Sequence, residues 1–180
     1  TIDSYNTAVG YDAGVSVTTG IQNTIVGGLA GGDLTDADYN VALGKSALSS
    51  DTLGSKSVAI GYAALNTQNF TTATDSFNTA VGTLAGEAVT TGTGNTLVGG
   101  LTGDALTVGN DNVAIGLNAL SADTKGSGSV AIGNVALQDQ NFTTATDAYN
   151  TAIGRSAGRD ITTGIQNTII GGLAGDALTD

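Results

Sequence analysis

The chain is 180 residues long and contains 28 glycines, no proline and, as its only aromatic residues, five tyrosines and three phenylalanines. Sixteen acidic residues against five basic ones give a net charge of −11, which argues strongly against a nucleic acid partner, because phosphate binding relies on lysine and arginine. The same balance disfavours docking on an anionic membrane. No apolar run approaches the roughly 20 residues of a transmembrane helix, so we expect no membrane insertion.

The composition also removes most catalytic chemistry. The chain has no histidine and no cysteine, so Ser-His-Asp and Cys-His arrangements, histidine- or cysteine-based zinc sites and disulfides cannot be built. Paired carboxylates could still perform acid–base catalysis, but most aspartates fall in polar segments, where bonding to the turn backbone is expected. We therefore predict no enzyme, no catalytic residue, no cofactor and no metal site. These aspartates are Asp33, Asp36, Asp38, Asp51, Asp104, Asp111, Asp123 and Asp139.

One five-residue phrase recurs through the whole chain: a polar residue, two small or apolar residues, a branched aliphatic residue and glycine. Its copies start 17 residues apart, except for two steps of 21. A short fixed period of strand-like sequence is the signature of a solenoid, and the regular return of branched aliphatic residues argues against low-complexity disorder. The ten copies are 6–10, 23–27, 40–44, 57–61, 78–82, 95–99, 112–116, 129–133, 150–154 and 167–171.

A longer period contains the shorter one. Three steps of 17 and one of 21 make a unit of 72 residues, and the text repeats at that length. We interpret the chain as a single repeat array, 1–180, with units at 3–74 and 75–146 and a partial unit at 147–180. Neither end resembles a cap that would protect a terminal strand. We therefore expect a segment of something longer, or a subunit that stacks end to end.

The repeat predicts an all-β fold, a parallel β-solenoid of ten coils of 17 or 21 residues. Each coil should hold two strands of about five residues joined by turns. The phrase forms the first strand, which its glycine ends, and an Ala-Gly or Ala-Leu pair marks the second. The four extra residues of the long coils should bulge outward around Phe70 and Phe142. The second-strand pairs are 13–14, 47–48, 64–65, 85–86, 119–120, 136–137 and 157–158.

Both faces of the first strand are apolar. Side chains alternate along a strand, and a strand that is apolar on both faces is buried on both. One column can fill the coil, while the other needs cover from another copy, so we predict a homo-oligomer, with a trimer favoured. Either column could face inward. The columns are Ala8, Ile25, Ala42, Ala59, Ala80, Leu97, Ala114, Ala131, Ala152 and Ile169, and Val9, Val26, Leu43, Ile60, Val81, Val98, Ile115, Ile132, Ile153 and Ile170.

Asparagine begins eight of the ten phrases, and Ser57 and Ser129 begin the other two. A polar recognition row is one interpretation of this column. We favour a structural one, in which each amide bonds to neighbouring coils or holds a turn, because the position lies at the entrance of a buried strand.

Phrases such as Asn6-Thr-Ala-Val-Gly10 and Ser57-Val-Ala-Ile-Gly61 resemble the head repeats of YadA-type trimeric autotransporter adhesins, and also repeat regions of bacteriophage tail fibres and bacterial surface filaments. The resemblance covers the whole chain. It implies a left-handed β-roll whose three chains associate through their inner sheets, outside the cell or on a virion. Coil length and the 72-residue unit depart from the adhesin pattern, and no stalk or anchor is present in this sequence, so the type of parent protein stays open.

Two functions remain as hypotheses. The first is a non-catalytic structural fibre: the shaft of an adhesin, a phage fibre or an extracellular filament, with an unknown receptor. The second is a binding face for ice or glycan, suggested by the threonines of 71–74 and 143–146, although these recur only once in four coils. Calcium is a weaker possibility, because oxygen ligands cluster at 33–38 and 110–112.

Overall fold

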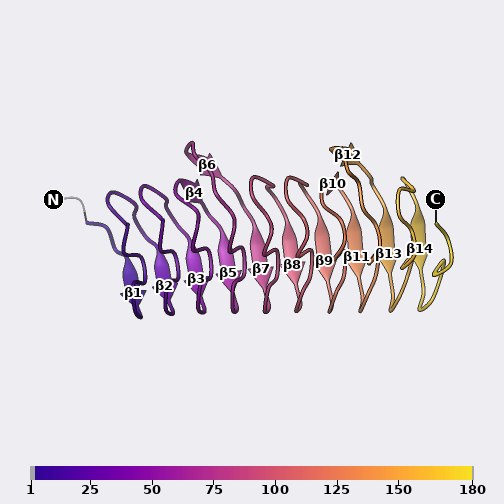
Figure 1. The fold of residues 1–180 in the computed structure, drawn as a ribbon, viewed down its shortest axis with the longest axis horizontal. Helices are drawn as coiled ribbons and strands as arrows, with labels where there is room; N and C mark the ends of the chain where they lie inside the picture. The colour runs from indigo at the N-terminus through magenta and orange to yellow at the C-terminus, as the bar shows by residue number, and fades with distance from the viewer. Residues whose placement is uncertain (1–2, 180) are drawn as a thin grey trace.

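The computed structural model describes residues 3–179 and is an all-β solenoid without a helix in that range (Figure 1). Ten parallel strands, one from each phrase, form one continuous sheet along the rod. They are β1 (Thr7–Val9), β2 (Thr24–Val26), β3 (Val41–Leu43), β5 (Val58–Ile60), β7 (Thr79–Val81), β8 (Thr96–Val98), β9 (Val113–Ile115), β11 (Val130–Ile132), β13 (Thr151–Ile153) and β14 (Thr168–Ile170).

The strands lie in lateral register. Ala8 is opposite Ile25, and Ile25 is opposite Ala42, and the same alignment continues to the end of the sheet. Two small parallel sheets accompany the long coils: β4 (Gly54–Ser55) with β6 (Thr74–Asp75), and β10 (Gly126–Ser127) with β12 (Thr146–Asp147). The predicted all-β parallel solenoid of about ten coils is therefore confirmed.

The predicted second strand is wrong. The Ala-Gly and Ala-Leu segments form successive turns, because several of their residues adopt the left-handed backbone that an extended strand does not contain. Ser46 has φ +57° and Leu48 has φ +51°. The turns still stack on one another, since the N–H of Leu48 donates to the carbonyl of Ala64 at 3.0 Å. A regular coil thus has one strand of three residues followed by stacked turns.

The glycine that ends each phrase brings neighbouring coils into close backbone contact. Gly82 has φ +143°, and a Cβ built on it would lie 2.2 Å from the carbonyl oxygen of Gly99 in the next coil. A side chain is therefore excluded both by conformation and by space. Directly beside this contact, the N–H of Gly99 donates to the carbonyl of Val81 at 2.8 Å.

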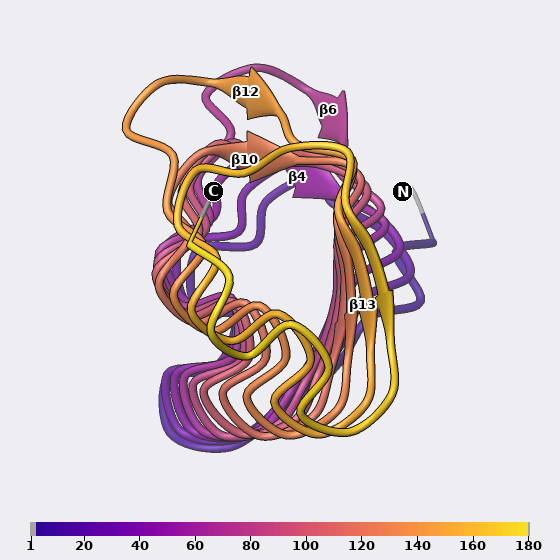
Figure 2. The same ribbon diagram turned by 90° about the vertical axis from the view of Figure 1, so that its right-hand side faces the viewer.

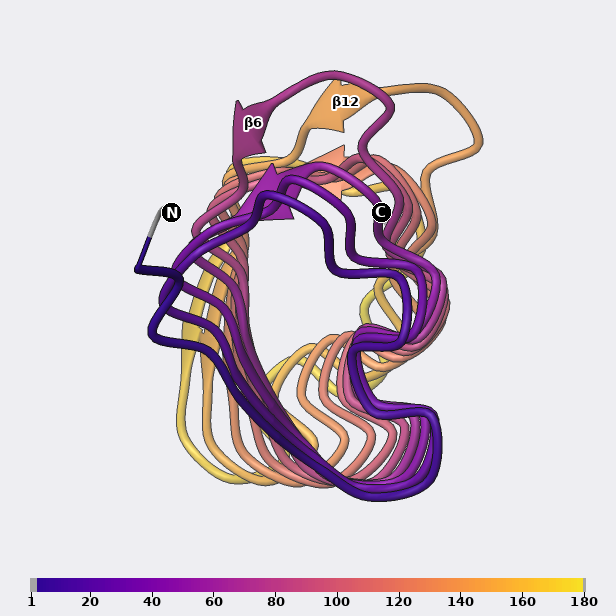
Figure 3. The same ribbon diagram turned by 90° about the vertical axis from the view of Figure 1, so that its left-hand side faces the viewer.

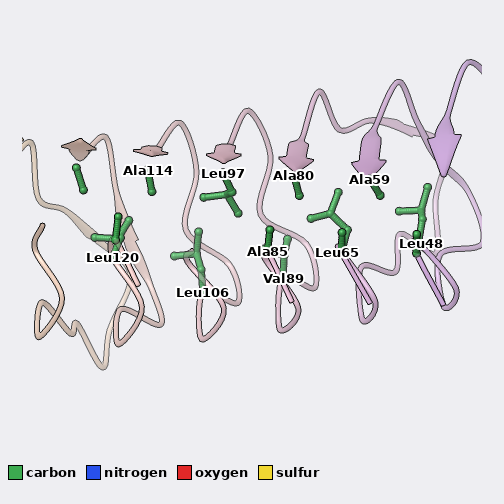
Figure 4. Packing of buried hydrophobic residues seen from close by; sticks show 14 of the residues in the cluster. Leu48, Ala59, Leu65, Ala80, Ala85, Val89, Leu97, Leu106, Ala114 and Leu120 are labelled. Atoms are coloured by element: carbon green, nitrogen blue, oxygen red, sulfur yellow. The ribbon is translucent and has the colours of Figure 1, made fainter. Parts of the chain in front are cut away.

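The core is a narrow column that runs the length of the rod (Figure 4). The alanine-rich column of the strands faces inward, so Ala80 and Leu97 are fully buried. They point toward large side chains from the turn segment, such as Leu65, Val89 and Leu106 (Figure 4). The question of which strand column faces the interior is thereby answered.

Two kinds of turn segment fill this core in different ways. Gly31 is followed three residues later by the buried Leu34, and a Cβ on Gly31 would lie 2.8 Å from Leu34 Cδ1. In the next coil Leu48 replaces the glycine, and Asp51 replaces the apolar residue. A left-handed leucine costs about 1–2 kcal/mol, which burial of its side chain, worth about 1.5–3 kcal/mol, offsets.

Viewed along the rod, the coils superimpose as a ring whose straight side carries the long sheet (Figure 2). The loops next to β6 and β12 project beyond the other coils on the same side of the rod, as the view from the opposite end also shows (Figure 3). The predicted bulge is confirmed, because Thr71, Thr72 and Ala73 are exposed. Phe70 and Phe142, however, are 94% buried at the base of these loops.

We expect the glycine contact to be essential for stability. Gly82→Ala should lower the free energy of unfolding by at least about 2 kcal/mol, because φ and the Gly99 carbonyl both oppose a Cβ. Gly32→Ala is the matched control, since the nearest atoms to its Cβ are at 3.4 and 3.6 Å and its effect should stay below about 1 kcal/mol. Denaturant unfolding followed by circular dichroism measures both, and equal losses would contradict this account.

Candidate functional site: the outer face of the long sheet

The outer face of the ten-stranded sheet is the largest regular surface of the molecule. In β3, Val41 and Leu43 are half-buried on either side of the fully buried Ala42, and the other inner strands repeat this pattern. The column predicted to need cover therefore lies outside the single chain. Beside it runs a column of threonine and valine: Thr7, Thr24, Val41, Val58, Thr79, Thr96, Val113, Val130, Thr151 and Thr168.

All five tyrosines border this face. We call the residue before each phrase the entry edge and the residue after each phrase the exit edge. Tyr5, Tyr39 and Tyr149 lie on the entry edge and are 49–72% exposed, as is Phe77 at 60%. The exit edge carries Tyr11, Tyr62 and Leu117, which are 51–77% exposed. Sequence reasoning missed these aromatic borders, although their fixed offset from the phrase was a readable signal.

Three of the five basic residues also lie on these edges. Lys45 and Arg155 follow their phrases and are exposed. Lys56 precedes its phrase, forms a salt bridge with Asp75 and lies 5.3 Å from the centre of the Phe77 ring. Among the described residues, neither Lys45 nor Arg155 forms a salt bridge.

The asparagine column forms the predicted amide ladder inside the rod. The side-chain carbonyl of Asn23 accepts the backbone N–H of Asn40 at 2.9 Å, and its amide donates to the carbonyl of Ala37 at 2.7 Å. Asn40 repeats both bonds with Ser57 and Gly54. Asn40 is fully buried, so the structural interpretation is confirmed and a recognition row is not formed.

A buried polar network replaces the ladder at the long coil. Asp51, Gln68 and Ser57 are fully buried, and the Gln68 amide donates to Asp51 Oδ2 at 2.6 Å and to Ser57 Oγ at 2.9 Å. Asp51 Oδ1 accepts the backbone N–H groups of Gly54 and Phe70, each at 3.0 Å. The carboxylate is thus held by several donors and is closed off from solvent, which makes it part of the scaffold.

The second unit repeats this network with one change. Gln140 donates to Asp123 Oδ2 at 2.6 Å and accepts from Asn150 at 2.8 Å. Ser76 of the first unit, whose hydroxyl contacts Ser57 and donates to the carbonyl of Ser55, is Ala148 in the second. Sequence reasoning missed the network; its signal was aspartate or glutamine at a position that is apolar in the other coils.

Most of the candidate calcium ligands are engaged in bonds between coils. Asp36 accepts the hydroxyl of Thr19 at 2.6 Å, Asp38 accepts the N–H of Ile21 at 2.8 Å, and Asn110 accepts the N–H of Thr93 at 2.8 Å. Within residues 3–179, no group of three or more acidic side chains could hold a metal ion.

Asp104 stands apart from the other aspartates. Its Oδ1 atom is buried without a hydrogen-bond partner in the described part of the chain. Burial, with a smaller contribution from the Glu87 carboxylate, raises the pKa of Asp104 above its usual value. The opposite case is Asp160, whose pKa is lowered by its hydrogen bond from Arg159.

The surface formed by residues 3–179 has no detectable pocket. The same residues contain no helix that is long and apolar enough to span a membrane. Comparison of the chain with protein-family models, with curated proteins and with solved structures found no match.

We expect the buried network to contribute strongly to stability. Asp51→Ala should lower the free energy of unfolding by about 3 kcal/mol or more, because it leaves the donors of Gly54, Phe70 and Gln68 buried and unpaired. The matched control is Ser76→Ala, which copies the second unit and should cost less than about 1 kcal/mol. Denaturant midpoints at one protein concentration measure both variants. A similar, small effect of both would show that the network is dispensable.

Proposed function

We propose that this chain is a non-catalytic segment of the shaft of an extracellular fibre, displayed on a cell surface or a virion. Three copies associate side by side through the outer face of the long sheet. The observation that carries the proposal is this continuous apolar face, which the single chain leaves open along its whole length. The resemblance of the phrases to YadA-type head repeats supports the three-fold state and a left-handed coil.

The size of the face supports association. Ten strands at a spacing of about 4.8 Å, with about 3.3 Å per residue from edge to edge, give a surface on the order of 900 Å². A stable interface buries about 800 Å² on each partner. Soluble monomers rarely expose an apolar patch above a few hundred Å², so covering this face removes a liability as well as forming a contact.

A shaft role is supported by the way the polar groups are used. Asn23, Asp51 and Gln68 hold coils to one another inside the rod, and the 72-residue unit returns with few changes. A receptor site would be expected to interrupt that regularity. Each unit instead adds the same four coils, which suits a spacer whose length is set by the number of units.

A second candidate is a face that binds an extended surface such as ice or glycan. Threonine occupies six of the ten positions in the outer column that begins with Thr7, so hydroxyl and methyl groups alternate across the face. Pairs of valine, such as Val41 and Val58, interrupt this row. The threonines at 71 and 72, which first suggested ice binding, lie on the projecting loop. A thermal-hysteresis assay distinguishes this function from the shaft.

Substitutions on the two faces of β5 separate folding from assembly. Ile60→Asp places a charge on the outer face, where a monomer leaves it solvated; it should prevent trimer formation while circular dichroism still reports a β-fold. Ala59→Asp buries an unpaired carboxylate in the core and should abolish the fold itself. Light scattering combined with circular dichroism measures both effects.

The wild-type chain is the reference for this comparison. It should scatter light as a particle three times the 17.5 kDa mass of the chain. A wild-type monomer at micromolar concentration would contradict the proposed assembly, as would an Ile60→Asp variant that remains trimeric.

A further inference from the structure

The borders of the outer face indicate how neighbouring protomers meet. A cyclic trimer has heterologous contacts, in which two different patches of the protomer touch. When three straight faces surround one axis, the end of a strand in one protomer approaches the beginning of a strand in the next. The exit edge of one copy therefore lies against the entry edge of its neighbour.

Cyclic symmetry also sets the height of this contact. Rotation about the axis carries no translation along it, so a coil meets the same coil of the neighbouring copy. The two edges of one coil can consequently be compared directly in the sequence, six residues apart. Within a single chain they cannot touch, because six residues of extended backbone span about 20 Å.

Read in this way, every basic residue on an edge faces an aromatic ring. Lys45 on the exit edge is matched with Tyr39 on the entry edge, and Arg155 with Tyr149. The coil after Tyr39 has the reverse order, with Lys56 on the entry edge and Tyr62 on the exit edge. All six side chains are exposed in the single chain.

The remaining coils are compatible with the same contact. The first coil matches Tyr5 with Tyr11, and the sixth matches Gly94 with Gly100. In no coil do the two edges carry charges of the same sign. The one acidic edge residue, Asp111, is matched with Leu117.

We propose that the edges close the trimer through cation–aromatic pairs, in which Tyr39, Lys56 and Tyr149 of one copy contact the residues equivalent to Lys45, Tyr62 and Arg155 in the next. This inference rests on the proposed trimer. A cation over an aromatic face is attractive, and pairs that reverse from one coil to the next oppose axial slippage, because a slip of one coil places Lys45 against Lys56. The pairs thus fix the register of the assembly as well as closing it.

Cross-linking in this cysteine-free chain tests the contact. Tyr39→Cys combined with Lys45→Cys, treated with a short bismaleimide, should give covalent trimers on a denaturing gel. Each single variant should give none, because two entry edges do not meet. Tyr39→Cys combined with Arg155→Cys is the mismatched control, since the two coils are six coils apart, about 29 Å, and it should also stay uncross-linked.

A charge exchange provides the second measurement. Tyr39→Lys sets two lysines against each other and should raise the concentration at which the trimer dissociates by about tenfold or more. Adding Lys45→Tyr restores the pair in the order of the Lys56 coil and should recover the wild-type value. Covalent dimers from a single cysteine variant, absence of the matched cross-link in a particle that is trimeric by light scattering, or no rescue would overturn the edge pairing while leaving the trimer intact. A monomeric wild-type chain would instead overturn the proposed function.

Discussion

The structure depends on the close approach of each coil to the next at the glycine that ends the strand. At Gly82 the backbone adopts φ +143°, and the carbonyl of Gly99 occupies the space of a side chain. This contact fixes the height of a coil and aligns the strand hydrogen bonds beside it. With that alignment, Asn23 reaches the backbone of Asn40 in the next coil. The ladder, the core column and the flat outer face all repeat because the glycine contact repeats.

A thin coil has one interior, which it fills from within. Inner-column residues such as Ala80 meet one large side chain per turn segment, so the branched aliphatic residues on the outer face are not needed to stabilise a single chain. The polar groups best protected from water, including Asp51 and Gln68, serve the scaffold. What the fold leaves open is a long apolar surface with aromatic and basic borders, and the proposed assembly uses that surface.

Much of this architecture was readable from the sequence. Regular spacing predicted the parallel solenoid and its register, and the asparagine column predicted the amide ladder. The inward column could not be chosen, because Ala59 and Ile60 are both apolar and only packing distinguishes them. The second strand was predicted wrongly, because residues such as Ser46 and Leu48 carry no marker of a left-handed backbone. The Asp51 network was missed because its members are distant in sequence and become neighbours only when coils stack.

The central claim is that every 72-residue unit adds four coils stacked on the previous ones. It is tested most directly by inserting one, two and three further copies of residues 75–146 and measuring the rod by electron microscopy. Four coils at about 4.8 Å each predict a constant increase of about 19 Å per copy at unchanged width. Particles that widen, become globular or lengthen by irregular amounts would contradict the account.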